Sequence, residues 1–387
     1  MSTINPNRIA RAHARRGLGE PSRLAASPLR HFDWLLVGAS LGITAIGLLM
    51  IYSTTHHRIP GDPYYFVKRQ ALFAVIGITA MVVVLLIDYK RLRDLPMVFY
   101  GATVFMLLAV LAPLGSNIKG HQAWFQLPGG FTLQPSELAK FGLIVFLAGY
   151  CNHYRGEIDA WRLTVIIGLV TVPIGLVLLQ PDLGTVMVLA VIIVGILAVA
   201  GVSGKQLIVL GLLAVTGVYA VVGLGLLKQY QVDRLTSFVS QGQDARNTTY
   251  NTDQSKNAIG NGGVTGRGFG NGSQTAGGFV PEQHTDFIFT AVGEEFGFLG
   301  AAGLLALFAI VVWRTWRAAL FARDFFGTLV CVGVLALFAF QIFVNMGMTM
   351  GIMPVTGIPL PLMSYGGSST VTAFACVALV ANVSMRR

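Results

Sequence analysis

The chain has 387 residues, of which 54% are hydrophobic and only 11% are charged, and its mean hydropathy is +0.67. Repeated apolar runs in such a composition exclude a soluble globular protein and indicate one that crosses a membrane several times. The net charge of +10 does not indicate a nucleic-acid partner, because the basic residues gather in an N-terminal arm and at the ends of the apolar runs.

Residues 1–32 form a basic arm ahead of the first apolar segment. The arm holds six arginines against one acidic residue, Glu20, and such a start can also indicate a transit peptide. It has no short apolar core followed by a small-residue cleavage site, so it does not resemble a removable signal peptide. We interpret it as a cytoplasmic arm that keeps the N-terminal end of the first span inside.

Ten apolar segments of roughly 17–25 residues follow, which is the length that a helix needs to cross the hydrocarbon core. The predicted fold class is therefore an all-α polytopic membrane protein in which residues 33–387 form one transmembrane domain. The fourth segment is the weakest, because Lys140 lies in its first turns. The segments are 33–52, 70–86, 96–114, 138–154, 163–179, 185–202, 206–227, 298–316, 326–346 and 369–385.

Charge asymmetry predicts the orientation of these spans. Ten spans place both chain ends on one side, and the proposed inner connections are richer in lysine and arginine than the short outer ones. Since positive residues favour the cytoplasmic side, we expect both termini in the cytoplasm.

Three segments are too long or too irregular to be simple turns. The connections 115–137 and 229–285 are long, and the second is glycine-rich and lies outside, between the seventh and eighth spans. A loop of that length is either functional or disordered, and aromatic residues at its edges favour packing on the bilayer surface. Residues 353–369 contain three prolines that exclude a continuous helix, so we expect this segment to be buried in protein or to line a cavity.

Asp286 and Glu294 are the strongest candidates for catalysis. They belong to an acidic stretch, residues 284–297, at the start of the eighth span, and a carboxylate near a bilayer usually faces a wet cavity or a partner. Asp286 could equally be an ordinary acid at a helix start, favoured by the helix dipole. In one continuous helix, residues eight apart differ by about 80° and 12 Å, so both carboxylates would line one side of a cavity.

Two further polar clusters fall on the same outer side. Glu137 and Lys140 form an i, i+3 pair, which is consistent with a structural ion pair and with a functional one. Asp182 lies in a Pro-Asp turn, a weak motif by itself because such turns are common. The long loop adds basic residues that either solvate it or bind an anionic lipid-linked substrate, namely Lys228, Arg234, Arg246, Lys256 and Arg267.

These stretches resemble the SEDS family (shape, elongation, division and sporulation proteins), whose members include RodA and FtsW. The resemblance covers nearly everything after the arm, and its most specific parts are His-Thr-Asp-Phe-Ile-Phe at 284–289 and Pro-Leu-Pro-Leu-Met-Ser-Tyr-Gly-Gly-Ser at 359–368. Residues 353–361 are more similar to the RodA branch than to the FtsW branch. The chain departs from the family pattern at Arg267, where lysine is expected, but the positive charge is kept.

The resemblance implies a peptidoglycan glycosyltransferase that polymerises lipid II outside the cytoplasmic membrane of a bacterium. A RodA-like member would serve cell elongation and rod shape, with a class B penicillin-binding transpeptidase as its partner. Asp286 would be the catalytic base and Glu294 a second important acid. Arginine, lysine or a divalent cation would stabilise the departing pyrophosphate, although the sequence defines no metal site. Trp124 matches a functional tryptophan, and the full set assigned to substrate binding is Trp124, Glu137, Lys140, Asp182, Arg234, Lys256, Arg267 and Ser364.

Two other function classes stay open at this point, a lipid II transporter (flippase) and a non-catalytic scaffold for cell-wall enzymes. A transporter places ionisable groups near the bilayer midplane, whereas a surface transferase needs them at the outer edge. Asp286, Asp182 and Glu137 all flank spans in the predicted topology, and this favours the transferase.

Overall fold

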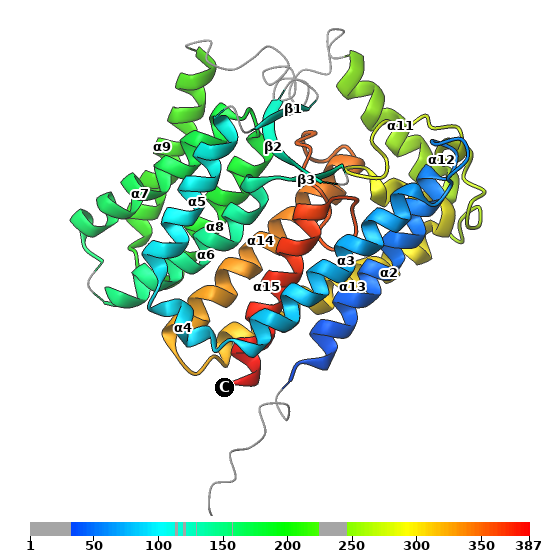
Figure 1. The fold of residues 1–387 in the computed structure, drawn as a ribbon. Coiled ribbons are helices and arrows are strands. Elements are labelled where there is room, and N and C mark those ends of the chain that lie inside the picture. Colours follow the sequence, from blue (N-terminus) through cyan, green and yellow to red (C-terminus); the bar gives the residue numbers. More distant parts are fainter. Residues whose placement is uncertain (1–31, 113–114, 119–120, 129, 157, 224–245) are drawn as a thin grey trace, which may run out of the picture.

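The computed structural model describes residues 32–387 apart from 113–114, 119–120, 129, 157 and 224–245 (Figure 1). The predicted arm, residues 1–32, lies outside the described residues except for its last position. Arg234 and Lys228 of the long loop also lie outside them.

Each of the ten predicted spans corresponds to a helix, and the fold is mostly helical, as predicted. Seven of these helices are long and apolar enough to cross a membrane, while α5 and the first part of α9 are shorter apolar helices. The helices that match the predicted spans are α2 (Trp34–Thr55), α3 (Tyr65–Leu86), α5 (Pro96–Leu111), α6 (Pro135–His153), α7 (Ala160–Leu179), α8 (Leu183–Ala200), α9 (Gly204–Gly223), α13 (Ile288–Leu320), α14 (Phe325–Thr349) and α15 (Gly367–Met385).

Aspartate residues mark the starts of several helices. The side chains of Asp33, Asp159, Asp182 and Asp324 each accept a hydrogen bond from a backbone N–H in the first turn of α2, α7, α8 and α14. Such caps satisfy backbone donors that have no partner within the helix. The short polar turns between apolar runs therefore determine where these helices begin.

The helices α14 and α15 form the centre of the bundle. They are the most buried of the seven candidate spans. In Figure 1, α15 lies beside α3, and α14 packs against α13, α8 and α6. The helix α2 packs on α13, and α5 packs on α6, so both lie further from the centre. Many large apolar side chains of the outer helices are exposed, as expected for surfaces that face lipid.

A small sheet in the connection 115–137 was not predicted. Its strands β1 (Ser116–Ile118), β2 (His121–Leu127) and β3 (Phe131–Leu133) pair antiparallel in the order β1-β2-β3. Two of the strands have three residues each, which is too short for a clear alternation of apolar and polar positions. The sheet lies across the starts of α6 and α15, at the end of the bundle away from the C-terminus (Figure 1).

The eighth span also begins earlier than predicted. The helix α13 starts at Ile288 instead of Phe298, and Gly297 breaks it with φ +64°. Glu294 and Glu295 in the first part are fully buried inside the protein, so their charges do not face lipid.

The long loop before α13 contains α11 (Arg246–Gly262), which packs on α13, and the short helix α12 (Ser273–Ala276). A short helix, α4 (Tyr89–Arg93), joins α3 to α5.

Candidate active site

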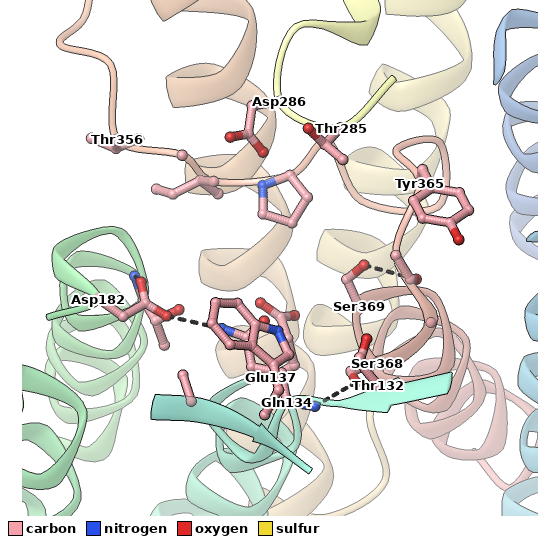
Figure 2. Close-up of a pocket in the computed structure, with 18 of the residues that line it drawn as sticks. Thr132, Gln134, Glu137, Asp182, Thr285, Asp286, Thr356, Tyr365, Ser368 and Ser369 are labelled. Carbon is pink, nitrogen blue, oxygen red and sulfur yellow. Dashed lines mark hydrogen bonds between the residues drawn. The ribbon is translucent and has the colours of Figure 1, made fainter. Parts of the chain in front are cut away.

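A cavity of about 790 Å³ opens where β2 and the starts of α6, α8 and α15 meet two irregular segments. One of these segments precedes α13, and the other joins α14 to α15. Figure 2 shows Asp286, Asp182 and Glu137 on different walls of this space. The polar and aromatic residues that line it include Trp124, Thr132, Gln134, Glu137, Lys140, Gln180, Asp182, Thr185, Glu282, His284, Thr285, Asp286, Thr356, Tyr365, Ser368 and Ser369.

The cavity brings together polar clusters that are far apart in the sequence. Trp124, Glu137, Lys140, Asp182 and Asp286 were all predicted as site residues, and all five line this one space. The proline-rich segment also lines it, through residues 356–359 and 365–369, as the exclusion of a continuous helix led us to expect. The three polar clusters expected on one side of the bundle therefore meet at one cavity, while their functional roles stay predictions.

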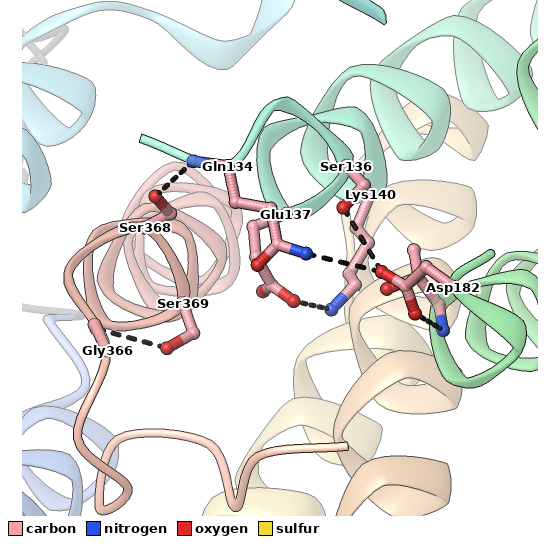
Figure 3. A network of polar contacts seen from close by, with 9 residues as sticks. Gln134, Ser136, Glu137, Lys140, Asp182, Gly366, Ser368 and Ser369 are labelled. Atoms are coloured by element: carbon pink, nitrogen blue, oxygen red, sulfur yellow. Dashed lines mark hydrogen bonds and ion pairs between the residues drawn. The ribbon is translucent and has the colours of Figure 1, made fainter. Parts of the chain in front are cut away.

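The predicted pair of Glu137 and Lys140 is present and buried. Lys140 Nζ lies 2.5 Å from Glu137 Oε1, and the two side chains are 2% and 7% exposed (Figure 3). Glu137 lies in the first turn of α6, where the helix dipole favours a negative charge. The carboxylate neutralises most of the ammonium charge, so Lys140 is a weak attractor for an anionic substrate by itself.

Asp182 connects three helix starts at the cavity wall. Its Oδ1 accepts from the backbone N–H of Thr185 at 2.9 Å, and its Oδ2 accepts from Gln134 Nε2 at 3.3 Å and Ser136 Oγ at 3.4 Å (Figure 3). The backbone N–H of Gln134 in turn donates to Ser368 Oγ at 2.8 Å. The starts of α6, α8 and α15 are thereby fixed relative to one another around Asp182.

Asp286 is half-buried and lies just before α13, in a segment of turns. Ser364, which was predicted to bind substrate, lies behind this segment and is only 2% exposed. Its hydroxyl donates to the Thr285 carbonyl at 2.6 Å and accepts from the Leu360 N–H at 2.8 Å. Both contacts are to backbone atoms, so the structure gives Ser364 a supporting position beside the cavity.

The prediction that Asp286 and Glu294 line the same cavity is wrong. Asp286 precedes α13, so the two residues do not share one continuous helix. The Glu294 carboxylate instead accepts from the backbone N–H groups of Gln274 and Thr275, at 2.8 and 2.9 Å, and from Thr275 Oγ1 at 2.8 Å. Glu294 thus attaches the first turn of α12 to α13, and it does not line the cavity.

The basic residues described in the long loop also lie away from the cavity lining. Lys256 on α11 has a half-exposed side chain, and its Nζ is 3.8 Å from Asp253 Oδ1. Arg267 is exposed, and its Nε donates to the Asn261 carbonyl at 2.8 Å. The structure therefore does not bring Lys256 or Arg267 together with Asp286, and Arg234 lies outside the described residues.

The sequence analysis did not single out Arg69 and Tyr365, two residues at or near the cavity. The Arg69 guanidinium lies 4.7 Å from the centre of the Tyr65 ring and 5.3 Å from that of Phe131, and it donates to the Gly130 carbonyl at 3.1 Å. Arg69 also interacts with Tyr365, which lines the cavity; burial raises the pKa of Tyr365, and Arg69 acts in the opposite direction. In the sequence, Arg69 is an ordinary basic residue near a short outer loop, and only the packing shows its neighbours.

The charged groups of the cavity are mostly carboxylates, which can take part in proton transfer. Among the lining residues that belong to the described part of the chain, Lys140 is the only lysine or arginine, against the acids Glu137, Asp182, Glu282 and Asp286. In the part of the chain that the structure describes, no group of three or more histidine, cysteine or acidic side chains gathers into a metal site. A carboxylate at a wet cavity wall is suited to accept a proton from a bound hydroxyl.

The sequence was compared with known families and proteins. The family model described as cell cycle protein, which covers FtsW, RodA and SpoVE, matches residues 33–387. Stage V sporulation protein E of Bacillus subtilis is 36% identical over 91% of this chain and 96% of that protein. A probable peptidoglycan glycosyltransferase FtsW of Geobacter metallireducens is 33% identical over 94% of this chain and 97% of that protein.

Solved structures show the same fold. The rod shape determining protein RodA of Thermus thermophilus superposes with a TM-score of 0.68 and 30% identity, over 95% of this chain and 99% of that one. A chain from a peptidoglycan synthase complex that coordinates polymerization and crosslinking superposes with a TM-score of 0.77 and 30% identity. That match covers 91% of this chain and 97% of the other.

Proposed function

The chain belongs to the family of FtsW, RodA and SpoVE, and we propose that this peptidoglycan glycosyltransferase polymerises lipid II at the outer face of the cytoplasmic membrane. The observation that carries the proposal is the Asp286 carboxylate at a cavity large enough for sugar units. Relatives bearing the name peptidoglycan glycosyltransferase support the reaction class.

Asp286 acts as the general base in this mechanism. Its carboxylate takes the proton from the 4-hydroxyl of the acceptor sugar while that oxygen attacks the anomeric carbon of the donor. The bond from the anomeric carbon to undecaprenyl pyrophosphate breaks, and the α linkage becomes β. Base catalysis of this kind typically contributes about 10²–10⁴-fold to the rate.

The leaving pyrophosphate needs positive charge that Lys140 supplies only in part, because Glu137 lies 2.5 Å from it. Arg69 is a further cation that the structure places beside a lining residue, Tyr365. Arg234 of the long loop is retained as a second candidate from the family resemblance. A guanidinium group can approach phosphate oxygens with two parallel hydrogen bonds.

The orientation follows from the distribution of charged residues along the bundle. Arg314 pairs at 2.8 Å with Asp33, which caps the start of α2, and Arg386 after α15 lies 3.8 Å from Asp88, which caps α4. The start of α2 and the helix α4 lie at the end of the bundle that holds the C-terminus (Figure 1). The cavity lies at the other end. Because arginine favours the cytoplasmic side, both termini are assigned to the cytoplasm and the cavity to the outside.

Residues 33–387 form one transmembrane domain behind the cytoplasmic arm, and the family match over these residues supports that division.

The cellular role proposed is elongation with a class B penicillin-binding transpeptidase. The RodA-like residues 353–361 support the elongation branch, although the relative from Geobacter metallireducens bears the name FtsW. The similarity to a chain from a complex that coordinates polymerization and crosslinking supports a transpeptidase partner.

Purified protein incubated with lipid II tests the function. The parent protein should form glycan polymer, and Asp286→Asn should abolish it while the purified protein remains folded. Asp253→Asn is a matched control, since Asp253 is exposed on α11 and does not line the cavity, and its activity should stay within twofold of the parent. Full polymerase activity in Asp286→Asn would refute the assignment, and transport of lipid II without polymer would support the flippase.

A further inference from the structure

Three successive backbone carbonyls at the candidate base are each fixed by a hydrogen bond from the same side. The His284 carbonyl accepts from the Tyr365 N–H at 2.9 Å, and the Thr285 carbonyl accepts from Ser364 Oγ at 2.6 Å. The Asp286 carbonyl accepts from Asn345 Nδ2 at 2.8 Å. The donors belong to α14 and to the segment between α14 and α15, so that part of the chain determines where Asp286 lies.

Asn345 also makes a second contact, with the proline-rich segment. Its Nδ2 also donates to the Ile358 carbonyl at 2.8 Å, and Ile358 lines the cavity. The amide therefore uses both of its protons on backbone oxygens. One of these oxygens belongs to the candidate base and the other to the proline-rich wall of the same cavity. A single side chain thus links these two segments of the site.

Asn345 itself cannot touch the substrate. It is fully buried within α14 and does not line the cavity. Its Oδ1 atom is buried and has no hydrogen-bond partner in the described part of the chain. Its two donated bonds therefore act on the backbone of the site and not on a bound substrate.

We propose that Asn345 is a positioning residue, which places the Asp286 carboxylate for proton transfer by fixing the Asp286 peptide relative to Ile358. The proposal rests on the proposed function of Asp286. A general base must lie within hydrogen-bond reach of the proton that it abstracts. A displacement of about 1 Å can cost roughly 10²-fold in rate. Losing Asn345 should therefore lower turnover far more than substrate binding.

The opposite side of the segment is attached through residues that Asn345 does not contact. Gln283 Nε2 donates to Thr275 Oγ1 at 2.9 Å and to Thr290 Oγ1 at 3.1 Å, and Thr275 is bound to Glu294. These side chains are all buried. The segment should therefore keep its general place when Asn345 is replaced, and the change should be confined to the peptide of Asp286.

The chain contains a matched control in Asn382. This residue is also fully buried, in α15, and its Nδ2 donates to the carbonyls of Val84 and Ile87, both at 2.6 Å. These contacts lie at the C-terminal end of α15, far along the helix from the cavity at its start. Replacing Asn382 by alanine removes the same two bonds from an amide to backbone carbonyls, and also the bond that Asn382 Oδ1 accepts from Arg386, but it does not touch the link to Asp286.

The test compares Asn345→Ala, Asn345→Ser and Asn382→Ala in steady-state polymerisation of lipid II and in thermal unfolding. Asn345→Ala should reduce kcat at least tenfold with KM within twofold, and Asn345→Ser, which keeps one donor, should fall between it and the parent. Asn382→Ala should lose a similar amount of thermal stability while kcat stays within twofold. Equal kcat values for Asn345→Ala and Asn382→Ala would overturn the proposal, as would a change in KM alone.

Hydrogen exchange supplies a readout that does not depend on activity. Peptides covering residues 281–290 should exchange faster in Asn345→Ala and unchanged in Asn382→Ala. If Asn345→Ala cannot be purified in folded form, the same comparison is decided with Asn345→Ser. If exchange is faster in Asn345→Ala but the parent protein itself forms no polymer, the positioning role holds and the proposed function of Asp286 fails. Unchanged exchange and turnover in an otherwise active protein would overturn the positioning role alone.

Discussion

The buried pair of Lys140 and Glu137 predicts a large difference between breaking the pair and removing it. Lys140→Met takes away the cation and leaves a carboxylate that is only 7% exposed, 2.5 Å from where its partner was. Removing one partner of a buried ion pair typically costs about 3–5 kcal/mol, because the remaining charge has lost its compensation. The unfolding entropy is about 2.1 cal/mol/K per residue, so in a domain of the size of residues 33–387 each kcal/mol lowers the melting temperature by about 1.3 °C. The expected fall is therefore about 4–7 °C.

The double variant Glu137→Gln with Lys140→Met should recover most of this loss. Replacing both partners of a buried pair by uncharged residues is often neutral or stabilising, by about 1–4 kcal/mol. Lys68→Met is the matched control, since Lys68 pairs with Asp62 at 3.0 Å while the side chains are 67% and 39% exposed. An exposed pair contributes about 0–1 kcal/mol, so the control should melt close to the parent protein.

Thermal unfolding of the detergent-purified variants, followed by tryptophan fluorescence, measures these differences. If Lys140→Met has the same melting temperature as Lys68→Met and the parent protein, the assignment of a buried pair whose charges compensate each other is refuted. A double variant no more stable than Lys140→Met would show that the Lys140 side chain contributes through packing. Polymerase assays on the folded double variant then separate stability from catalysis. Loss of activity at parental stability supports a functional pair.

Two further predictions concern topology and substrate contacts. A cysteine introduced at Asn257, an exposed position on α11, should react with an impermeant thiol reagent in intact cells. The native cysteines are buried, so they should contribute little labelling. Labelling that appears only after lysis would contradict the assignment of this loop to the outside. Arg234→Ala should weaken use of lipid II about tenfold if it binds pyrophosphate, since a charge-assisted bond contributes about 1.5–3 kcal/mol and each 1.4 kcal/mol is one decade. Lys256→Ala should stay within twofold, because its half-exposed side chain lies away from the cavity, and titration of each variant with lipid II decides both.

Local sequence patterns determined the spans and much of the site. Apolar length predicted the ten helices that match the predicted spans, but not the short or polar helices α4, α11 and α12, because only a membrane-spanning helix needs a run of apolar residues that is visible in the chain itself. The i, i+3 spacing of Glu137 and Lys140 predicted their ion pair, since helix geometry alone brings such positions together. The predicted topology put Asp286 and Asp182 on the same side of the bundle, and in the structure both line one cavity.

Only the tertiary structure decided which groups surround these residues. The contact of Asn345 with Asp286 joins residues 59 positions apart, and that of Gln134 with Ser368 joins residues 234 apart. No spacing rule predicts such pairs, because they depend on how whole helices pack against one another. Glu294 shows the same limit. A continuous helix would have placed its carboxylate on the side of Asp286, but α13 begins only at Ile288, and the carboxylate binds the backbone of α12. A sequence encodes helix lengths and starts locally, but the contacts that position a catalytic group form only when distant segments come together.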